Sequence, residues 1–398
     1  MVARSLDGKV KQYYHALIHR EDVIVMTTTT AISVQEITEQ QQWNAFLVSQ
    51  PRGHLLQSYE WGELNKYLGG RIYRLGALED GRLVGAMLLT VAPVPLPVKV
   101  PGIQLNWLYS VRGPTVERPD SPALAALIAH AHTLAKQEHA VVLRVEPNIA
   151  DDDPDEDVWL AAYHRLGFHT NPIAVHGRRS WVLDIRPDLD TLLANFKMTW
   201  RQNVRAAERK GVIIREANGE KDFDTYYNLL TVTSERDDFF IHSKDYHKEI
   251  LRYFASKGDA VLYLAEHDGE AIAAKMLIRF GDWCWDMFGA SSNEKRNLKP
   301  TYLLQYRCFA WAKSRSCSYF DFRTIPEILE PGEEMWGVYE YKKGYDGFSR
   351  LNMPTQDYVY RPLLYKSWRK LVEVRRAQRH AERKKVEMER AARGSKTS

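Results

Sequence analysis

Alternating apolar and polar residues predict two β-hairpins of the same design in distant parts of the chain. The first spans residues 75–89, with an Asp-Gly turn that ends at Gly81. The second spans residues 264–278, with an Asp-Gly turn that ends at Gly269. An Asp-Gly pair between two apolar runs favours a tight hairpin because both residues tolerate the positive φ angles of the turn. The repetition indicates one structural unit that occurs twice.

A helix and a further strand follow each hairpin. A helical pattern ending at Lys136 precedes the apolar run 141–145, and one ending at Lys313 precedes the run 319–322. This order of elements is that of a GNAT-like N-acyltransferase unit. The pattern predicts an α/β protein of two tandem GNAT-like lobes with mixed, mainly antiparallel sheets flanked by helices. A chance match of common Asp-Gly hairpins is the alternative, and a fold does not assign chemistry.

Length and composition agree with two lobes. With 398 residues, the chain exceeds the size at which one hydrophobic core usually stops growing. A hydrophobic content of 44% excludes a disordered chain, and 27% charged residues leave no apolar run long enough to cross a bilayer as a helix. Three cysteines, an odd number, indicate a reducing compartment, and the charged N-terminus does not read as a secretory signal. We therefore expect a cytoplasmic protein.

The net charge of +4 is unevenly distributed. Residues 366–398 are strongly basic, whereas the rest of the chain is mildly acidic. A basic C-terminal helix or tail would suit RNA phosphates or an anionic membrane leaflet. A solvated helix with a frayed end is an equally good interpretation.

A second basic feature is the predicted helix 195–211, which Gly211 would end. Its cations recur every four residues and so form one slowly winding row of Lys197, Arg201, Arg205 and Arg209. Such a row can hold phosphates. A solvated surface with local pairing to Glu208 is the alternative.

Segment 107–114 combines aromatic residues at a strand end, Tyr109 among them, with Arg112 and a Gly-Pro turn. This combination indicates the rim of a pocket. Glu117 and Asp120 follow closely and could orient an amine or accept its proton, although carboxylates after a turn are more often simply solvated.

In segment 337–347, Lys342 and Lys343 lie among three tyrosines. A cation could be held there against aromatic faces, near a developing oxyanion. If residues 339–343 form a strand, the two lysines point to opposite faces, and only one can enter the site. We favour Lys342.

Several motifs are missing from the sequence. There is no H-E-x-x-H zinc motif, Walker loop, nucleophile elbow or dinucleotide fingerprint. The glycine-rich loop by which GNAT enzymes grip coenzyme A is also absent. The corresponding stretch of the second copy, residues 291–300, is basic but not glycine-rich. This counts against coenzyme A as donor, and we expect no cofactor and no metal.

Taken together, these residues resemble the Fem family (FemABX) of non-ribosomal peptidyl transferases, which carry amino acids from aminoacyl-tRNA onto peptidoglycan precursors. The similarity runs from about residue 36 to residue 366. The matching segments are, in order, 56–61, 112–114, 200–211, 288–291, 319–323 and 337–342. Each match is weak alone, and the order makes them fairly specific.

The resemblance implies roles for individual residues. Lys66 and Arg201 would contact the phosphates of the precursor, with Arg205 beside them, and Tyr109 would line its cleft. Tyr341 and Lys342 would sit beside the ester under attack.

The resemblance also implies the division of the chain. Residues 1–30 would be an extension, 31–180 the first lobe, 181–347 the second lobe and 367–398 a basic helix or tail. Strands from about 348–366 would complete the first lobe. No charged heptad stretch interrupts the second lobe, so we expect no coiled-coil arm. We further expect a monomer, which could touch the inner face of the membrane peripherally.

The implied reaction is aminolysis of aminoacyl-tRNA by the stem-peptide amine, with Lys342 stabilising the oxyanion. Two other interpretations remain open. One is an N-acyltransferase that uses coenzyme A or another acyl donor, and the other is a non-catalytic module that binds precursor or RNA. The sequence does not identify the amino acid, the general base, or whether the acceptor is nucleotide-linked or lipid-linked.

Overall fold

The computed structural model describes residues 31–94, 104–374 and 378. From Ile32 onward the chain belongs to one compact unit. The expected extension 1–30, most of the proline-rich stretch after Pro93 and most of the basic tail lie outside the described residues. No helix of the described part is both long and apolar enough to span a membrane.

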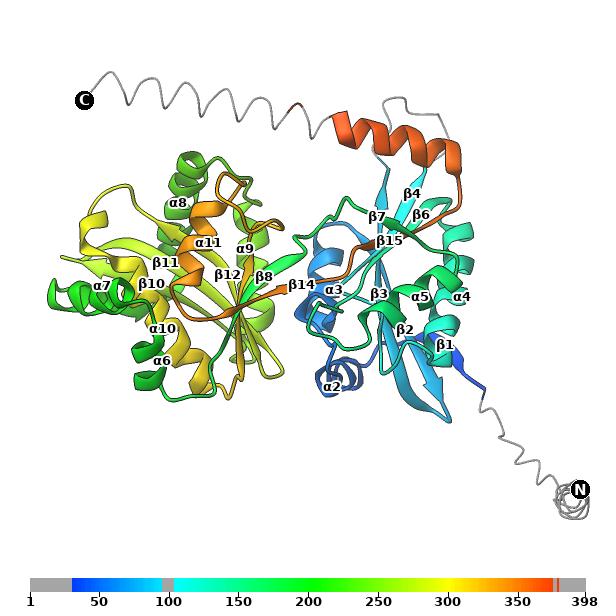
Figure 1. Cartoon of the computed structure of the whole chain (residues 1–398), viewed down its shortest axis with the longest axis horizontal. Coiled ribbons are helices and arrows are strands. Elements are labelled where there is room, and N and C mark those ends of the chain that lie inside the picture. Colours follow the sequence, from blue (N-terminus) through cyan, green and yellow to red (C-terminus); the bar gives the residue numbers. More distant parts are fainter. Residues whose placement is uncertain (1–30, 95–103, 375–377, 379–398) are drawn as a thin grey trace, which may run out of the picture. The chain divides into compact units, whose positions relative to one another are not determined.

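The first lobe is built on an eight-stranded sheet with the order β1-β2-β3-β4-β6-β15-β7, in which β5 pairs with β3. Its strands are β1 (Ser33–Glu36), β2 (Arg71–Glu79), β3 (Arg82–Pro93), β4 (Asn106–Val111), β5 (Thr115–Val116), β6 (Ala140–Glu146), β7 (His169–Asn171) and β15 (Thr355–Val359). Its helices are α2 (Gln40–Ser49), η1 (Leu55–Gln57), α3 (Tyr59–Tyr67), α4 (Pro122–Gln137) and α5 (Glu156–Arg165). Figure 1 labels all of these elements except β5 and η1.

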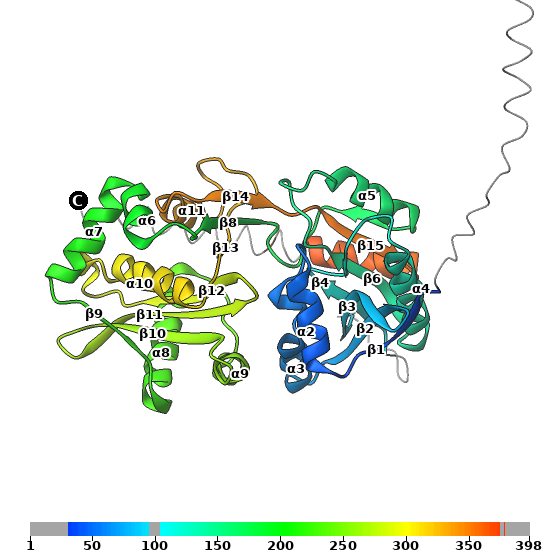
Figure 2. The ribbon, with the colours of Figure 1, turned by 90° about the horizontal axis from the view of Figure 1, so that it is seen from below.

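The second lobe is built on a seven-stranded sheet with the order β14-β8-β13-β12-β11-β10-β9. Its strands are β8 (Arg179–Asp184), β9 (Ile213–Glu216), β10 (Ala260–His267), β11 (Glu270–Phe280), β12 (Trp283–Ser291), β13 (Tyr319–Thr324) and β14 (Phe348–Leu351). Its helices are α6 (Leu189–Asn195), α7 (Met198–Arg209), α8 (Gly219–Asp237), α9 (Lys244–Ala255), η2 (Arg296–Leu298), α10 (Pro300–Ser314) and α11 (Trp336–Lys343). In Figure 2, α10 covers one face of this sheet, and α8 and α9 cover the other.

The two predicted hairpins are confirmed as β2–β3 and β10–β11. Each turns on an Asp-Gly pair with positive φ at both residues, 49° and 77° in the first hairpin and 53° and 76° in the second. Such a turn matches the right-handed twist of its strands. The helices that follow the hairpins, α4 and α10, lead into β6 and β13 as expected, which confirms the tandem GNAT-like fold. Helices α8 and α9 pack on the second sheet and do not project as an arm.

The lobes differ where their central strands run parallel. In the first lobe, β4 and β6 stay paired to their last residues, Val111 with Glu146. In the second lobe, β12 and β13 pair only along Trp283–Trp285 and Tyr319–Asp321, and the register ends there. The side chain of Arg323 enters this split and donates to the carbonyl of Met287 at 3.3 Å. The second lobe therefore offers an opening in its sheet that the first lobe lacks.

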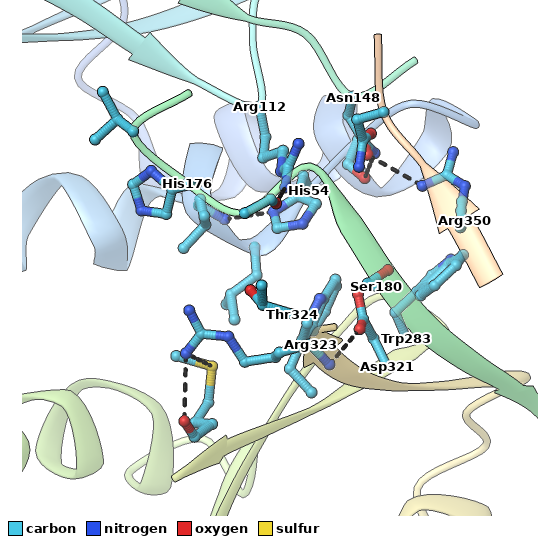
Figure 3. A pocket seen from close by; sticks show the side chains of 18 residues that line it. His54, Arg112, Asn148, His176, Ser180, Trp283, Asp321, Arg323, Thr324 and Arg350 are labelled. Carbon is cyan, nitrogen blue, oxygen red and sulfur yellow. Dashed lines mark hydrogen bonds between the residues drawn. The ribbon is translucent and has the colours of Figure 1, made fainter. Parts of the chain in front are cut away.

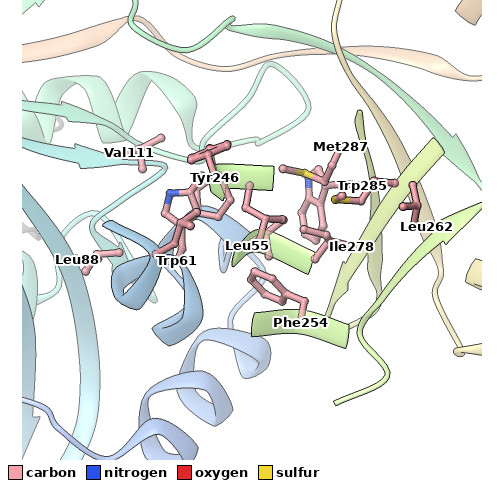
Figure 4. Close-up of a cluster of buried hydrophobic side chains, with 14 of the residues drawn as sticks. Leu55, Trp61, Leu88, Val111, Tyr246, Phe254, Leu262, Ile278, Trp285 and Met287 are labelled. Atoms are coloured by element: carbon pink, nitrogen blue, oxygen red, sulfur yellow. The ribbon is translucent and has the colours of Figure 1, made fainter. Parts of the chain in front are cut away.

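One hydrophobic cluster joins the lobes (Figure 4). It combines Leu55 and Trp61 of the first lobe with Phe254 and Trp285 of the second. Helix α3 packs against α9 at this cluster, and the buried carboxylate of Glu60 on α3 pairs with Lys257 at 2.5 Å. Because burial of apolar area is the main stabilising term in folding, this shared core resists separation of the lobes.

Two local expectations are corrected by the structure. Residues 339–343 form part of helix α11 rather than a strand. Strand β14, expected to complete the first lobe, pairs with β8 in the second sheet, and only β15 returns to the first sheet, beside β6 and β7. A helix over residues 362–374 follows β15.

A buried ion pair fixes β15 in the first sheet. The guanidinium of Arg144 on β6 donates two 2.7 Å hydrogen bonds to the carboxylate of Asp357. Asn171 and Tyr365 also donate to this carboxylate, at 2.7 and 2.6 Å. Both carboxylate oxygens of Asp357 therefore accept hydrogen bonds. A buried ion pair is tolerated when its remaining lone pairs are bonded in this way.

Asp357→Ala is expected to lower the free energy of unfolding by about 3–5 kcal/mol, because it leaves the Arg144 charge buried and unpaired. Urea denaturation followed by circular dichroism measures the loss. The matched control is Asp120→Ala, which removes one partner of an exposed pair with Arg118 and should cost less than about 1 kcal/mol. Equal losses of unfolding free energy in the two variants would contradict the conclusion that the Arg144–Asp357 pair holds β15 in the first sheet.

Candidate functional site

A cavity of about 270 Å³ lies between the two sheets, with walls from both lobes. Figure 3 shows His54, Arg112 and His176 on one side, and Asp321, Arg323 and Thr324 on the other. The remaining lining residues are Gly53, Leu55, Leu56, Asn148, Val175, Gly177, Ser180, Trp283, Trp285, Met287, Arg350 and Asn352. The split between β12 and β13 opens into this space, since residues of both strands line it.

Two arginines give the cavity its charge. Arg112 follows β4, and Arg323 lies near the end of β13. Both residues have left-handed backbone conformations, with φ of 52° and 65°. Residues other than glycine adopt this conformation only at a cost in free energy. Within the described residues neither guanidinium has a carboxylate oxygen within 4.0 Å. Arg112 donates to the carbonyl of Gly177 at 2.7 Å, a neutral acceptor.

Arg350 adds a third guanidinium, held by Asn148 at 3.1 Å and Asp152 at 3.2 Å. Burial lowers the pKa of Arg112, although the guanidinium remains a cation under all ordinary conditions. The buried Asp321 accepts a 2.6 Å hydrogen bond from the backbone N–H of Arg323, and burial raises its pKa. Convergent guanidinium groups in a partly dry cavity are suited to phosphate or carboxylate groups.

His54 contributes a donor rather than a charge. Its Nδ1 accepts a hydrogen bond from the backbone N–H of Leu56 at 3.0 Å, so the neutral ring carries its proton on Nε2. Burial, followed by the charge of Arg112, lowers the pKa of His54 well below the usual value. The ring is therefore neutral at physiological pH.

A chain of hydrogen bonds ends at the cavity in His176. The hydroxyl of Tyr109 donates to Glu146 at 2.5 Å, and Nδ1 of His176 lies 2.7 Å from the same hydroxyl. Burial alone would raise the pKa of Glu146, but its contacts with His176, Tyr109 and Val175 outweigh burial and lower it to about 2. The carboxylate can then only accept, so Tyr109 donates to it, and His176 donates its Nδ1 proton to Tyr109. Nε2 of His176, the other ring nitrogen, has no hydrogen bond to any described residue.

Lys342 lies directly behind the cavity wall. Its ammonium donates to the carbonyl of Thr324, a lining residue, at 2.8 Å. Burial lowers the pKa of Lys342 to about 7, and Asp286 partly opposes this effect. Lys343, the next residue of α11, is exposed and stands over the ring of Tyr339. The two lysines therefore point in different directions, as the expected strand would also have required, but they do so on a helix.

Tyr341 orients α11 rather than lining the cavity. Its hydroxyl donates to the carbonyl of Thr301 at 3.2 Å and accepts from Tyr345 at 2.8 Å. Burial raises the pKa of Tyr341 to about 12, so the phenol stays neutral.

Of the residues singled out in the sequence, only Arg112 lines the cavity. Tyr109 reaches it through His176. Lys66 is exposed on α3 and pairs with Glu63 at 3.1 Å. Glu117 and Asp120 are exposed beyond β5, where Asp120 faces Arg118. Arg201 and Arg205 lie on α7, which packs against α10 and contributes nothing to the lining.

Sequence reasoning missed His54, His176 and Arg350, and assigned no role to Arg323. Arg323 ends one of the matching Fem segments, so a signal for it was present. The two histidines lie in connecting segments without a motif, and no pattern in the sequence brings them together.

Comparison with known proteins places this geometry in context. The model of the FemAB family matches residues 38–271 and 266–372. The lipid II:glycine glycyltransferase of Staphylococcus aureus (strain MRSA252) is 23% identical over 396 residues, covering 82% of this chain and 92% of that protein. The crystal structure of FemX superposes with a TM-score of 0.76 at 22% identity, covering 84% of this chain and 99% of that one. L-PGS from Bacillus licheniformis gives a TM-score of 0.50 at 14% identity, covering 85% and 98%.

The repeated hairpin, helix and strand define the chain as a tandem GNAT-like protein. Because the FemAB model covers nearly all of both lobes, the chain belongs to the FemAB family. The family expected from the sequence is therefore confirmed.

Proposed function

We propose that this protein is an aminoacyltransferase that carries an amino acid from aminoacyl-tRNA to the stem-peptide amine of a peptidoglycan precursor. Membership of the FemAB family supports the proposal, as does similarity to a protein named lipid II:glycine glycyltransferase. The observation that carries it is the cavity itself, which is lined by three guanidinium groups and by His176, with Lys342 bonded to the lining residue Thr324 behind its wall.

The anionic acceptor occupies the cavity in this proposal. Its phosphate or carboxylate groups meet Arg112, which follows β4, and Arg323 and Arg350, which lie on β13 and β14. Charge-assisted hydrogen bonds to such groups are about twice as strong as neutral ones. The acceptor thereby holds its amine at a fixed place between the lobes, which supplies the alignment that aminolysis requires.

The reaction forms one C–N bond and breaks one C–O bond. The neutral amine attacks the ester carbonyl, His176 Nε2 takes the proton that the amine loses, and the oxyanion is stabilised by the Lys342 ammonium. Collapse expels the ribose oxygen of the tRNA end, which takes up the proton that His176 accepted. Thr324 holds the ammonium until the ester oxygen replaces its carbonyl as acceptor. The ester is already activated, so no covalent enzyme intermediate is needed.

Transfer of label from a radiolabelled aminoacyl-tRNA tests the proposal. Purified protein is given the labelled donor with either UDP-linked muropeptide or lipid II, and in parallel acetyl-coenzyme A with the same acceptors. Label in the muropeptide or lipid fraction supports the proposal and identifies the acceptor. Acetylation without aminoacylation would establish the coenzyme A alternative, and tight precursor binding without any transfer would establish a binding module.

Arg323→Ala is expected to weaken precursor binding by about 10- to 100-fold, the effect of losing one hydrogen bond to a charged group. Isothermal titration calorimetry with UDP-linked muropeptide measures the change. Arg118→Ala, which removes an exposed cation of the first lobe, is the control and should bind normally. Unchanged affinity of Arg323→Ala would remove the cavity from acceptor binding.

A further inference from the structure

A strongly basic surface lies outside the cavity, on α7 and η2. Lys197, Arg201, Arg205 and Arg209 recur along α7, and Arg296 and Lys299 belong to the η2 segment. Lys210 ties the two segments together, because its ammonium donates to the carbonyl of Asn297 at 2.9 Å. We call these six cations, which exclude Lys210, the α7 face.

The charges of the α7 face are uncompensated. Within the described residues none of the six has a carboxylate oxygen within 4.0 Å. Other cations of the same lobe do form such pairs, as Arg215 does with Asp222 and Arg252 with Glu249. Like charges four residues apart on a helix repel and destabilise it. A row of four is therefore costly for the free protein, and a bound polyanion would remove the cost.

The spacing of the row fits a polymer better than a single phosphate. Successive members are about 6 Å apart along the helix axis, and the row from Lys197 to Arg209 is about 18 Å long. The apolar residues Val204 and Ala207 of α7 are buried, and Met198 alone among its large apolar residues is well exposed. A helix that inserts into a membrane surface turns its apolar face outward, so these observations favour RNA over a lipid surface.

Helix α7 is bonded directly to α11, the helix that carries Lys342. The indole N–H of Trp200 donates to the carbonyl of Tyr341 at 3.0 Å, and the backbone N–H of Lys197 donates to the carbonyl of Gly344 at 2.9 Å. A side chain at Gly344 would place its Cβ 2.3 Å from the Trp200 ring, so α7 and α11 can lie this close only with glycine there. The helix that carries the row of cations is therefore packed directly on α11.

We propose that the α7 face docks the sugar–phosphate backbone of the acceptor arm of the donor tRNA, next to the helix that presents Lys342. The proposal rests on the proposed function for the identity of the RNA. In this proposal Arg201 and Arg205 contact the donor tRNA rather than the precursor. The contacts are to phosphates, so they position the RNA without reading its sequence.

Direct binding of deacylated tRNA tests the docking without any transfer reaction. The variant Arg205→Glu/Arg209→Glu changes two exposed cations that make no ion pair within the described chain. We expect its tRNA affinity, measured by fluorescence anisotropy, to fall at least about tenfold, and the logarithmic salt dependence to flatten by about two. The control Lys136→Glu/Arg165→Glu makes the same change of net charge in the last turns of α4 and α5 of the first lobe. It should bind tRNA as the unaltered protein does.

Transfer kinetics separate docking of the arm from recognition of the ester. The loss in kcat/KM caused by Arg205→Glu/Arg209→Glu should be at least about tenfold greater with full-length aminoacyl-tRNA than with a short aminoacylated RNA that lacks the arm. Circular dichroism verifies that both double variants are folded.

Three outcomes would overturn the proposal. The first is unchanged tRNA affinity of Arg205→Glu/Arg209→Glu, and the second is an equal loss of tRNA affinity in the control Lys136→Glu/Arg165→Glu. The third is that Arg205→Glu/Arg209→Glu loses binding to phosphatidylglycerol vesicles but still binds tRNA. If instead tRNA binds at the α7 face but no amino acid is transferred, docking stands and only the proposed function fails.

Discussion

Lys342→Met should reduce transfer by at least about tenfold, and by up to about 10²- to 10³-fold if the ammonium is a principal oxyanion donor. Methionine keeps the length of the side chain but cannot donate to the developing charge. Precursor affinity should be retained, because the ammonium is bonded to Thr324 and does not line the cavity. Single-turnover rates with saturating aminoacyl-tRNA, together with calorimetric titration of the precursor, measure the two effects separately.

The pH profile provides a second readout of Lys342. Because the pKa of Lys342 is about 7, its ammonium form is lost as the pH rises through that value. The kcat/KM of the unaltered protein should therefore decline on the alkaline side of about pH 7, and the residual activity of Lys342→Met should lack this decline. Near-normal turnover of Lys342→Met would exclude the lysine from the mechanism.

Stability should move in the opposite direction to activity. The folded pKa of Lys342 lies below its usual value, so between about pH 7 and the usual lysine pKa the unfolded chain binds more protons than the folded chain. The lysine therefore lowers the stability of the fold increasingly as the pH falls through this window. Lys342→Met removes this effect and should unfold at a urea concentration no lower than that of the unaltered protein at pH 7.

His176→Gln should slow transfer by about 10²-fold or more, the usual effect of removing a general base. Glutamine can still donate to Tyr109 but has no basic nitrogen for the amine proton. Donor and acceptor affinities should change little, so the loss should be confined to kcat. Steady-state kinetics with both substrates varied measure this division.

Tyr109→Phe is the companion variant to His176→Gln. It removes the hydroxyl that orients His176 but leaves the imidazole in place, so its loss should be smaller and of the same kind. Normal kcat in His176→Gln would show that another group, or the substrate itself, takes the proton. An increase in KM without a change in kcat would make His176 a binding residue.

Local sequence patterns predicted much of the fold. The Asp-Gly hairpins and the helices α4 and α10 follow from turn chemistry and hydrophobic periodicity, which act within a few residues. The end of α7 near Gly211 follows from the positive φ of 81° that this glycine adopts. The row of cations on α7 was likewise visible, because helical spacing alone determines which residues share a face.

The candidate site was much less accessible to sequence reasoning. Segment 336–343 resembles a strand in its tyrosine content, but it forms a helix in which Tyr341 packs on Trp200 and on Tyr302 of α10. Tertiary contacts override the propensity. The left-handed backbone at Arg112 and Arg323 could not be predicted, since arginine has no preference for it. Glu117 and Asp120 were candidates to orient the amine or accept its proton, but they are exposed on the surface of the first lobe.

The sequence by itself determined the repeated unit, the absence of a glycine-rich coenzyme A loop and the surplus of cations on α7. These features depend on neighbours along the chain. Only the tertiary structure decided that β12 and β13 part, that Lys342 lies behind the carbonyl of Thr324, and that His176 is held by Tyr109 and Glu146. The reason is that the bonded groups are 18 to 67 residues apart along the chain, and only the folding of each lobe brings their atoms within hydrogen-bonding distance.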